Sequence, residues 1–145
     1  MKRRKAREYA LQFLYRIDFV TQDSKLKNQE SGRRDSLELF WSDKDEKDPD
    51  TKYFAEDIIS ETIKNLKKID TLIQKVAEKW KISRMASIDR NILRFAIYEL
   101  LFRNDIPNAV TINEALEIAK KYSTSESAAF INGILDKIAK EYCQK

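Results

Sequence analysis

The sequence predicts an all-α protein, and three observations support this fold class. Apolar residues recur at the three- and four-residue spacing of helices through most of the chain. Glycine and proline number two each, fewer than turn-rich β architectures usually need. Hydrophobic residues make up 42% of the 145 residues and charged residues 36%, so the chain is long enough to bury a core beneath a strongly charged surface.

The N-terminal half predicts one clear helix, a weaker one and then a long helical stretch. A helix over about residues 3–20 places one apolar stripe inward, formed by Ala6, Ala10, Phe13, Leu14 and Ile17. Charge dominates residues 21–50, with a short helix expected around residues 37–41. Asp48 is a good N-cap and Pro49 a good first helical residue, so the next helix should begin there. Its apolar pattern continues to Trp80, and the sequence leaves open whether Asp70 divides it.

The C-terminal half predicts three helices. Ser87 is expected to cap a helix that is apolar around almost its whole circumference, which is typical of a central helix. After the turn residues 104–108, Thr111 and Glu114 have the spacing of a capping box. Residues 123–126 offer another cap for the last helix. Gly133 inside that helix costs about 1 kcal/mol relative to alanine, which predicts a closely packed neighbour.

Positive charge is concentrated at the N-terminus. Five cations without an intervening acid form what we call the N-terminal basic cluster: Lys2, Arg3, Arg4, Lys5 and Arg7. Such a cluster is an electrostatic footprint for phosphate, although a solvated helix end would look the same. Because cations at a helix start oppose the helix dipole, a purely stabilising role is disfavoured.

The composition argues against most kinds of catalysis. Without histidine and with one cysteine, the chain lacks the usual zinc clusters and the Ser-His or Cys-His nucleophilic pairs. Two glycines cannot supply a phosphate-binding loop of the G-x-x-x-x-G-K-[ST] or G-x-G-x-x-G type. We therefore expect no enzymatic activity, cofactor or metal, unless several carboxylates converge in one pocket.

We also expect a cytoplasmic protein. No apolar run approaches the roughly 20 residues of a membrane span. The first residues lack the apolar stretch of a signal peptide.

Several sequence blocks together resemble the NusB family of bacterial transcription antitermination factors. The blocks are SIDRNILRFAIYEL at 87–100, INEALEIAK at 112–120, FINGILDK at 130–137 and RRKARE at 3–8. Their order and spacing match the family over residues 1–20 and roughly 50–142. The charged segment 21–50 has no recognisable counterpart.

The resemblance implies a single compact domain over residues 1–145, with about seven helices in two packed bundles. The N-terminal bundle would span about residues 1–80 and the C-terminal bundle about 83–145. The ligand would be the single-stranded boxA element of ribosomal RNA leader transcripts. The protein partner would be NusE, a small-subunit ribosomal protein, and both would join an antitermination complex on RNA polymerase.

The resemblance also implies site residues. RNA would be bound by six side chains, namely Lys2, Arg3, Arg4, Arg7, Tyr15 and Phe130. Asp89 and Glu126 match polar positions of the RNA and partner surface, although an acid in a helix's first turn also suits the helix dipole. Ala129 replaces a residue that is often basic in the family, which removes a candidate phosphate contact.

Helical geometry independently places Tyr15 and Phe130 away from the core stripes of their helices. At 100° per residue, their rings point roughly 140° and 120° from the stripe centres. Unpaired bases stack on such rings, so we interpret both as stacking platforms. The alternative is that each ring packs in a second helix–helix seam.

Two other functions fit parts of the sequence. An RNA-binding module of the kind fused to ribosomal RNA methyltransferases would need a catalytic domain for which 145 residues leave no room. A protein-binding adaptor or self-associating helical bundle, including a homodimer, is the alternative without RNA. It is suggested by Leu11, Tyr15 and Phe19, which lie off the core stripe of the first helix.

Overall fold

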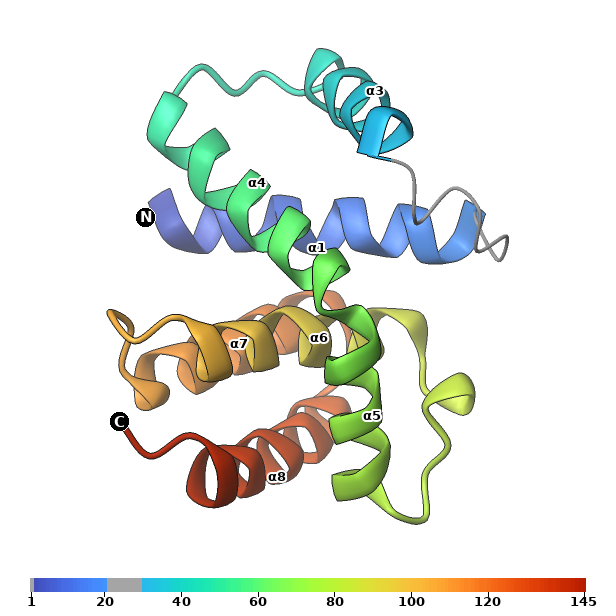
Figure 1. Ribbon diagram of the computed structural model, residues 1–145, viewed down its shortest axis with the longest axis vertical. Helices are drawn as coiled ribbons and strands as arrows, with labels where there is room; N and C mark the ends of the chain where they lie inside the picture. Colours follow the sequence, from blue (N-terminus) through green and yellow to red (C-terminus); the bar gives the residue numbers. More distant parts are fainter. Residues whose placement is uncertain (1, 21–29) are drawn as a thin grey trace. The chain divides into compact units, whose positions relative to one another are not determined.

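The computed structural model confirms the all-α prediction. It describes the backbone of residues 2–20 and 30–145 and the side chains of residues 2–18 and 36–145. Within these ranges the chain forms seven α-helices, one short 3-10 helix and no strand (Figure 1). Two compact units are present, Met1–Ile59 and Ser60–Lys145. The boundary between them lies within α4, whereas the sequence led us to expect it near residues 80–83.

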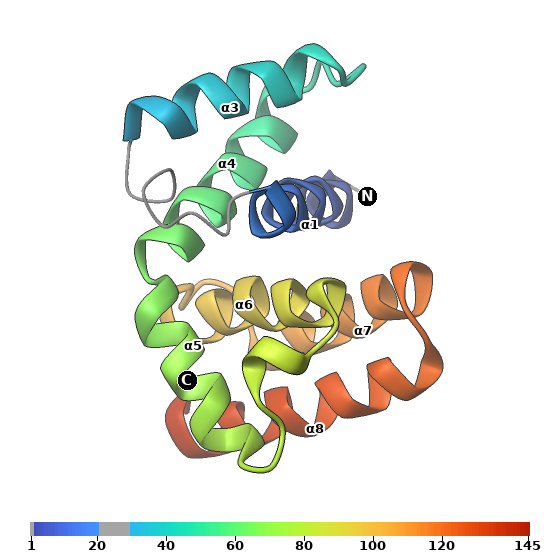
Figure 2. The ribbon, with the colours of Figure 1, turned by 90° about the vertical axis from the view of Figure 1, so that its right-hand side faces the viewer.

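The first unit is built from α1 (Lys2–Val20), α3 (Glu30–Ser42) and most of α4 (Pro49–Lys64). Figures 1 and 2 show that α3 runs across α1, because each helix is seen lengthwise in the view where the other is seen end-on. Four aromatic side chains join the two helices by edge-to-face contacts. Ring centroids lie 5.1 Å apart for Tyr9 and Trp41, and 5.5 Å apart for Phe13 and Phe40. The weakly predicted helix around residues 37–41 is therefore real and supplies part of the core.

The start of α4 is capped as predicted. Asp48 Oδ2 accepts hydrogen bonds from the backbone N–H of Thr51 at 2.9 Å and from its hydroxyl at 2.8 Å. Pro49 is the first helical residue, where its missing N–H costs nothing.

The long helical stretch is divided at Asn65, between α4 and α5 (Leu66–Ala77), which answers the question left open by the sequence: Asp70 lies inside α5 and does not divide it. Helical hydrogen bonds continue on both sides of this position, from Asn65 N–H to the Glu61 carbonyl and from Ile69 N–H to the Asn65 carbonyl. Asp70 instead accepts two hydrogen bonds, each 2.8 Å long, from the Arg94 guanidinium. This bidentate pair joins α5 to the middle of α6 (Ser87–Phe102).

The second unit is organised around α6 (Ser87–Phe102). Every residue from Asn91 to Leu100 is buried, which confirms that this helix is central. It packs against α7 (Asn108–Tyr122) and α8 (Ser125–Tyr142), and α5 contacts both α6 and α8 (Figure 1). A short 3-10 helix, η1 (Ile82–Arg84), lies between α5 and α6.

Two of the three predicted helix starts in this unit are wrong. Ser87 is the first residue of α6 rather than its cap, which is Ala86. Helix α7 begins at Asn108, ahead of the predicted capping box, because Thr111 is buried and its hydroxyl donates to Glu99 Oε1 at 3.2 Å. The third prediction is confirmed, since the Thr124 hydroxyl accepts a hydrogen bond from the Ser127 N–H at the start of α8.

Two packing expectations are also wrong. Leu11 is buried rather than available to a protein partner. Gly133 is exposed, and a Cβ atom built there would meet no atom within 4 Å, so no close neighbour explains this glycine. In the part of the chain that is described, no helix has the length and apolarity needed to cross a membrane.

Candidate nucleic-acid interface

The N-terminal basic cluster is partly neutralised by the acidic segment that precedes α4. Lys5 Nζ lies 2.9 Å from Glu46 Oε1, and Lys2 Nζ lies 3.4 Å from Asp48 Oδ1. Both lysines remain mostly exposed, whereas the Glu46 side chain is buried. Sequence reasoning treated the basic and acidic segments separately, because nothing in their spacing shows that the fold brings them together.

Glu46 is the centre of this contact. Its Oε1 accepts hydrogen bonds from Lys5 and from the Tyr9 hydroxyl at 3.0 Å, and its Oε2 accepts one from the Asp48 N–H at 3.1 Å. The hydrogen bond from Lys5 is the main cause that lowers the pKa of Glu46 below its ordinary value, and the same bond raises the pKa of Lys5. Both shifts favour the charged forms, the Glu46 carboxylate and the Lys5 ammonium group.

Two arginines of the basic cluster lie against one ring. The guanidinium carbons of Arg3 and Arg7 are 4.7 Å and 5.3 Å from the centroid of Phe54, a residue of α4. Arg3 is exposed and Arg4 half-buried, but Arg7 is only 2% exposed. Arg7 therefore offers little surface to a phosphate, and its position suits a cation–π contact that joins α1 to α4.

Tyr15 lies on the same helix as the basic cluster. Its side chain is 39% exposed, while Phe13 and Leu14 beside it are buried. The helix thus carries a large accessible ring and several accessible cations on its surface.

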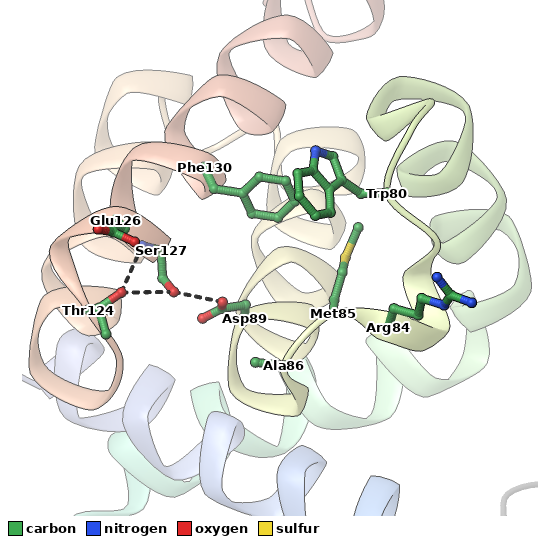
Figure 3. A pocket seen from close by; sticks show the side chains of 9 residues that line it. All are labelled: Trp80, Arg84, Met85, Ala86, Asp89, Thr124, Glu126, Ser127 and Phe130. Carbon is green, nitrogen blue, oxygen red and sulfur yellow. Dashed lines mark hydrogen bonds between the residues drawn. The ribbon is translucent and has the colours of Figure 1, made fainter.

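The second unit contains a pocket of about 320 Å³ between the starts of α6 and α8 and the segment after α5 (Figure 3). Three of the predicted site residues line it together: Asp89, Glu126 and Phe130. Trp80, Arg84 and Met85 line it as well, and sequence reasoning missed all three. In Figure 3 the rings of Trp80 and Phe130 lie side by side at the top of the pocket, with Met85 beneath Trp80.

Asp89 is buried and both of its carboxylate oxygens are used. Oδ1 accepts a hydrogen bond from the Ser123 hydroxyl at 2.9 Å, and Oδ2 accepts one from the Ser127 hydroxyl at 2.8 Å. Because Ser127 belongs to the capped first turn of α8, Asp89 joins the start of α6 to the start of α8. Glu126, by contrast, is exposed at the rim.

Trp80 was expected in the core but is 62% exposed. Helix α5 ends at Ala77, and Glu78 has a positive φ of 49°, uncommon for a residue other than glycine, where the chain turns away from the helix. The Gln74 side chain holds the resulting loop, donating to the Trp80 carbonyl at 3.1 Å and accepting from the Ile82 N–H at 2.9 Å. The Trp80 ring then meets half-buried Phe130 edge-on, with centroids 6.1 Å apart.

The pocket combines apolar ring surfaces with hydroxyl and carboxylate groups. Among the described residues, no three histidine, cysteine, aspartate or glutamate side chains converge as metal ligands would. The two carboxylates in the pocket have different surroundings. Asp89 accepts hydrogen bonds from two serines, and Glu126 is exposed at the rim.

An all-helical chain with a cationic helix start in one unit and an aromatic pocket in the other has the features of a small helical binding protein. Comparison with known proteins defines the group more narrowly. The NusB family model matches residues 4–140, and the chain belongs to the NusB family.

The relatives span nearly the full chain. A protein from Thermodesulfovibrio yellowstonii named transcription antitermination protein NusB is 58% identical over 142 residues, covering 97% of this chain and 93% of the relative. The structure of NusB from T. maritima has a TM-score of 0.80 and 41% identity, covering 98% of this chain and 93% of that one. A crystal structure of the antitermination factors NusB and NusE in complex with double-stranded RNA has a TM-score of 0.82 and 26% identity, covering 97% and 98%.

Proposed function

We propose that this chain is a transcription antitermination factor that binds single-stranded boxA RNA together with NusE and joins an antitermination complex on RNA polymerase. The names of its relatives support antitermination, and the solved complex of NusB, NusE and RNA supports the two ligand classes. The RNA element and the polymerase complex follow from the family resemblance of the sequence.

The observation that carries the RNA part is the presence of exposed cations and the exposed Tyr15 ring on one helix. Cations bind phosphates of any nucleic acid, but a ring stacks on bases only where they are unpaired. We therefore assign phosphate contacts to Lys2, Arg3 and Arg4, and base stacking to Tyr15. The buried Arg7, which the sequence placed among the phosphate contacts, acts instead by supporting Phe54 and the geometry of the cluster.

The pocket of the second unit supplies the other contacts in this proposal. Phe130 offers part of its ring, held edge-on by Trp80, to a base. Glu126 at the rim contacts RNA or NusE directly. Asp89 acts indirectly, by fixing the starts of α6 and α8 through Ser123 and Ser127.

Titration of the protein with boxA RNA, with and without NusE, tests the proposal. We expect binding to single-stranded boxA RNA, weaker binding to the same sequence paired in a duplex, and tighter binding when NusE is present. RNA must then raise the affinity for NusE by the same factor, because coupling is reciprocal. Equal affinity for boxA and an unrelated sequence, or independent binding of RNA and NusE, would refute it.

A protein-binding or self-associating adaptor is the second candidate. It is favoured by Leu39 and Tyr53, two large apolar side chains of the first unit that are strongly exposed. Sedimentation at several protein concentrations distinguishes the candidates. An adaptor of this kind would form a homodimer and bind no RNA, and Leu39→Ser with Tyr53→Ser would make it monomeric.

A further inference from the structure

A second basic surface lies on α5, in a different unit from the N-terminal basic cluster. Four lysines form it, namely Lys64, Lys67, Lys68 and Lys75, and we call it the α5 lysine stripe. Lys68 and Lys75 are seven residues apart, which places them on one side of α5, and Lys64, Lys67 and Lys68 line one common depression. The buried residues of α5, Ile69, Ile73 and Ala77, face the core of the unit instead.

Three of the four lysines surround an open depression of about 410 Å³. Its lining consists of Lys64, Lys67 and Lys68 with the neutral side chains Asn65 and Thr71. Every charged group in this lining is therefore positive.

These lysines form no ion pair within the described part of the chain. None of the four lies within ion-pairing distance of a described carboxylate, in contrast to Lys120, Lys137 and Lys140, which each have an acidic partner. The nearest acid on α5 itself, Asp70, is held by Arg94. The positive potential of the stripe is thus available to an external anion.

Two of the four ammonium groups lie over exposed aromatic rings. Lys68 Nζ lies 5.2 Å from the centroid of Phe102 in α6, and Lys75 Nζ lies 5.8 Å from that of Tyr142 in α8. Both rings are 41% exposed. A cation over a ring loses less freedom when it binds a phosphate, and the ring leaves an apolar surface beside the charge.

Two lysines of the stripe are unfavourable for folding, whereas Lys64 and Lys75 lie in the last turns of α4 and α5, where cations suit the helix dipole. Lys67 and Lys68 lie in the first turn of α5, where no acid compensates them and where cations oppose the helix dipole. Their position lowers helix stability, so it is better explained by an external ligand.

From these observations we infer that the α5 lysine stripe binds the phosphate backbone of single-stranded RNA that flanks the element held by the N-terminal basic cluster. The inference rests on the proposed RNA-binding function. Its charge pattern, a row of unpaired lysines interleaved with exposed rings, is typical of sequence-independent binding to single strands. The stripe therefore adds affinity and salt dependence without adding sequence preference.

Three RNA probes test the inference: boxA alone, oligouridine alone, and boxA with oligouridine on both sides. The test variant carries Lys64→Gln, Lys67→Gln and Lys68→Gln. We expect its affinity for boxA alone to match the wild type. For the flanked RNA, the slope of log K against log salt should become shallower by about 2, at roughly 0.7 per phosphate contact on a single strand.

The matched control carries Lys120→Gln, Lys137→Gln and Lys140→Gln, which removes the same charge from lysines that already have acidic partners. It should bind all three RNAs with nearly the wild-type slope. A further variant with Lys64→Arg, Lys67→Arg and Lys68→Arg should retain the wild-type slope, because the positive charge stays in place. Equal losses in the control and test variants would overturn the inference, because net charge alone would explain them.

The same probes separate this inference from the proposed function. If wild-type protein fails to bind boxA alone but binds oligouridine through the stripe, the proposed function fails and the stripe stands. If wild-type protein binds boxA, and the test variant binds flanked RNA with the wild-type affinity and salt dependence, the inference about the stripe is refuted and the proposed function stands. Polyglutamate, as a model of an acidic protein, is a fourth probe. If the test variant loses binding to polyglutamate while its RNA binding stays unchanged, the stripe binds an acidic protein and the inference is overturned.

Discussion

Two neighbouring residues of α1 allow effects on RNA binding to be measured separately from effects on stability. Tyr15 is exposed, whereas Phe13, two residues earlier, is buried against Phe40. We expect Tyr15→Ala to weaken binding to boxA RNA by about 1–3 kcal/mol, the usual effect of losing one stacked base. Its free energy of unfolding should fall by less than about 1.5 kcal/mol, as is usual for surface sites. Fluorescence titration and urea unfolding measure the two quantities.

Phe13→Ala is the control for Tyr15→Ala. A buried aromatic costs about 3–5 kcal/mol on truncation, so this variant should lose stability first. A large loss of stability in Tyr15→Ala, with unchanged RNA affinity of the folded fraction, would place the Tyr15 ring in a packed seam.

Asp89 is a second residue whose role the structure makes testable. Asp89→Ala removes the acceptor of two serine hydroxyls at the junction of α6 and α8. We expect urea unfolding to show a loss of about 1–3 kcal/mol, because hydrogen bonds to a charged group are among the stronger ones. Asp136→Ala, which breaks an exposed pair with Lys140, should cost less than about 1 kcal/mol. Equal effects would mean that the Asp89 network contributes little.

At the level of elements, the pairing of α1 with the segment before α4 should depend on pH. The pKa of Glu46 is lowered from its ordinary value of 4.5, so its contribution to stability is complete above that value. The contribution is lost as pH falls through the lower pKa of the folded state. We expect Glu46→Gln to be less stable than wild type near neutral pH, and the difference to shrink in acid.

Thermal unfolding across this pH range measures the effect of Glu46→Gln. Asp45→Asn, at an exposed position of the same segment, is the control and should leave the acid dependence almost unchanged. A constant difference between Glu46→Gln and wild type at all pH values would show that the charge of Glu46 is not the cause.

Helix α8 offers a stabilising substitution. Gly133 lies inside the helix, is exposed, and leaves open space where a Cβ would be. Gly133→Ala should therefore raise the free energy of unfolding by about 1 kcal/mol, mainly through the lower backbone entropy of the unfolded chain. Urea unfolding checks this, and a loss of stability would reveal a contact that the helix needs.

The elements that the sequence predicted well are those with a strong local signal. The apolar circumference of α6 and the Asp48-Pro49 start of α4 are confirmed because periodicity and capping act within a few residues. The errors arise where distant residues decide. Trp80 follows the helical spacing of α5, but the turn at Glu78 and the Gln74 side chain remove it from the core. Thr111 has the capping pattern, but Glu99 on another helix binds it.

The candidate site was only partly predictable for the same reason. Residue type and resemblance identified Asp89, Glu126 and Phe130, which the fold brings to one pocket. The contribution of Trp80 required knowledge of where α5 ends. The burial of Arg7 depends on the position of Phe54, more than forty residues away in sequence.

For the whole molecule, the net charge of +4 is small, so we expect the salt dependence of RNA binding to be modest. If Lys2, Arg3 and Arg4 each neutralise one phosphate of boxA RNA, log K should fall with log salt at a slope near −2, at roughly −0.7 per contact. Arg7→Lys should leave this slope unchanged while lowering stability, because Arg7 is buried against Phe54. A slope that becomes shallower in Arg7→Lys would show that Arg7 also meets a phosphate.

The carboxylates of Glu46 and Asp48 have a consequence for RNA affinity. They act as internal counter-ions, occupying the ammonium groups of Lys5 and Lys2 before any RNA arrives. A phosphate that approaches these lysines must compete with the protein's own acids. Part of the electrostatic attraction of the lysines therefore stabilises the contact between α1 and the start of α4 and does not contribute to RNA affinity. Folding and RNA affinity therefore trade against each other in this segment: a chain with amides at both positions would hold RNA more tightly and its own first helix less securely.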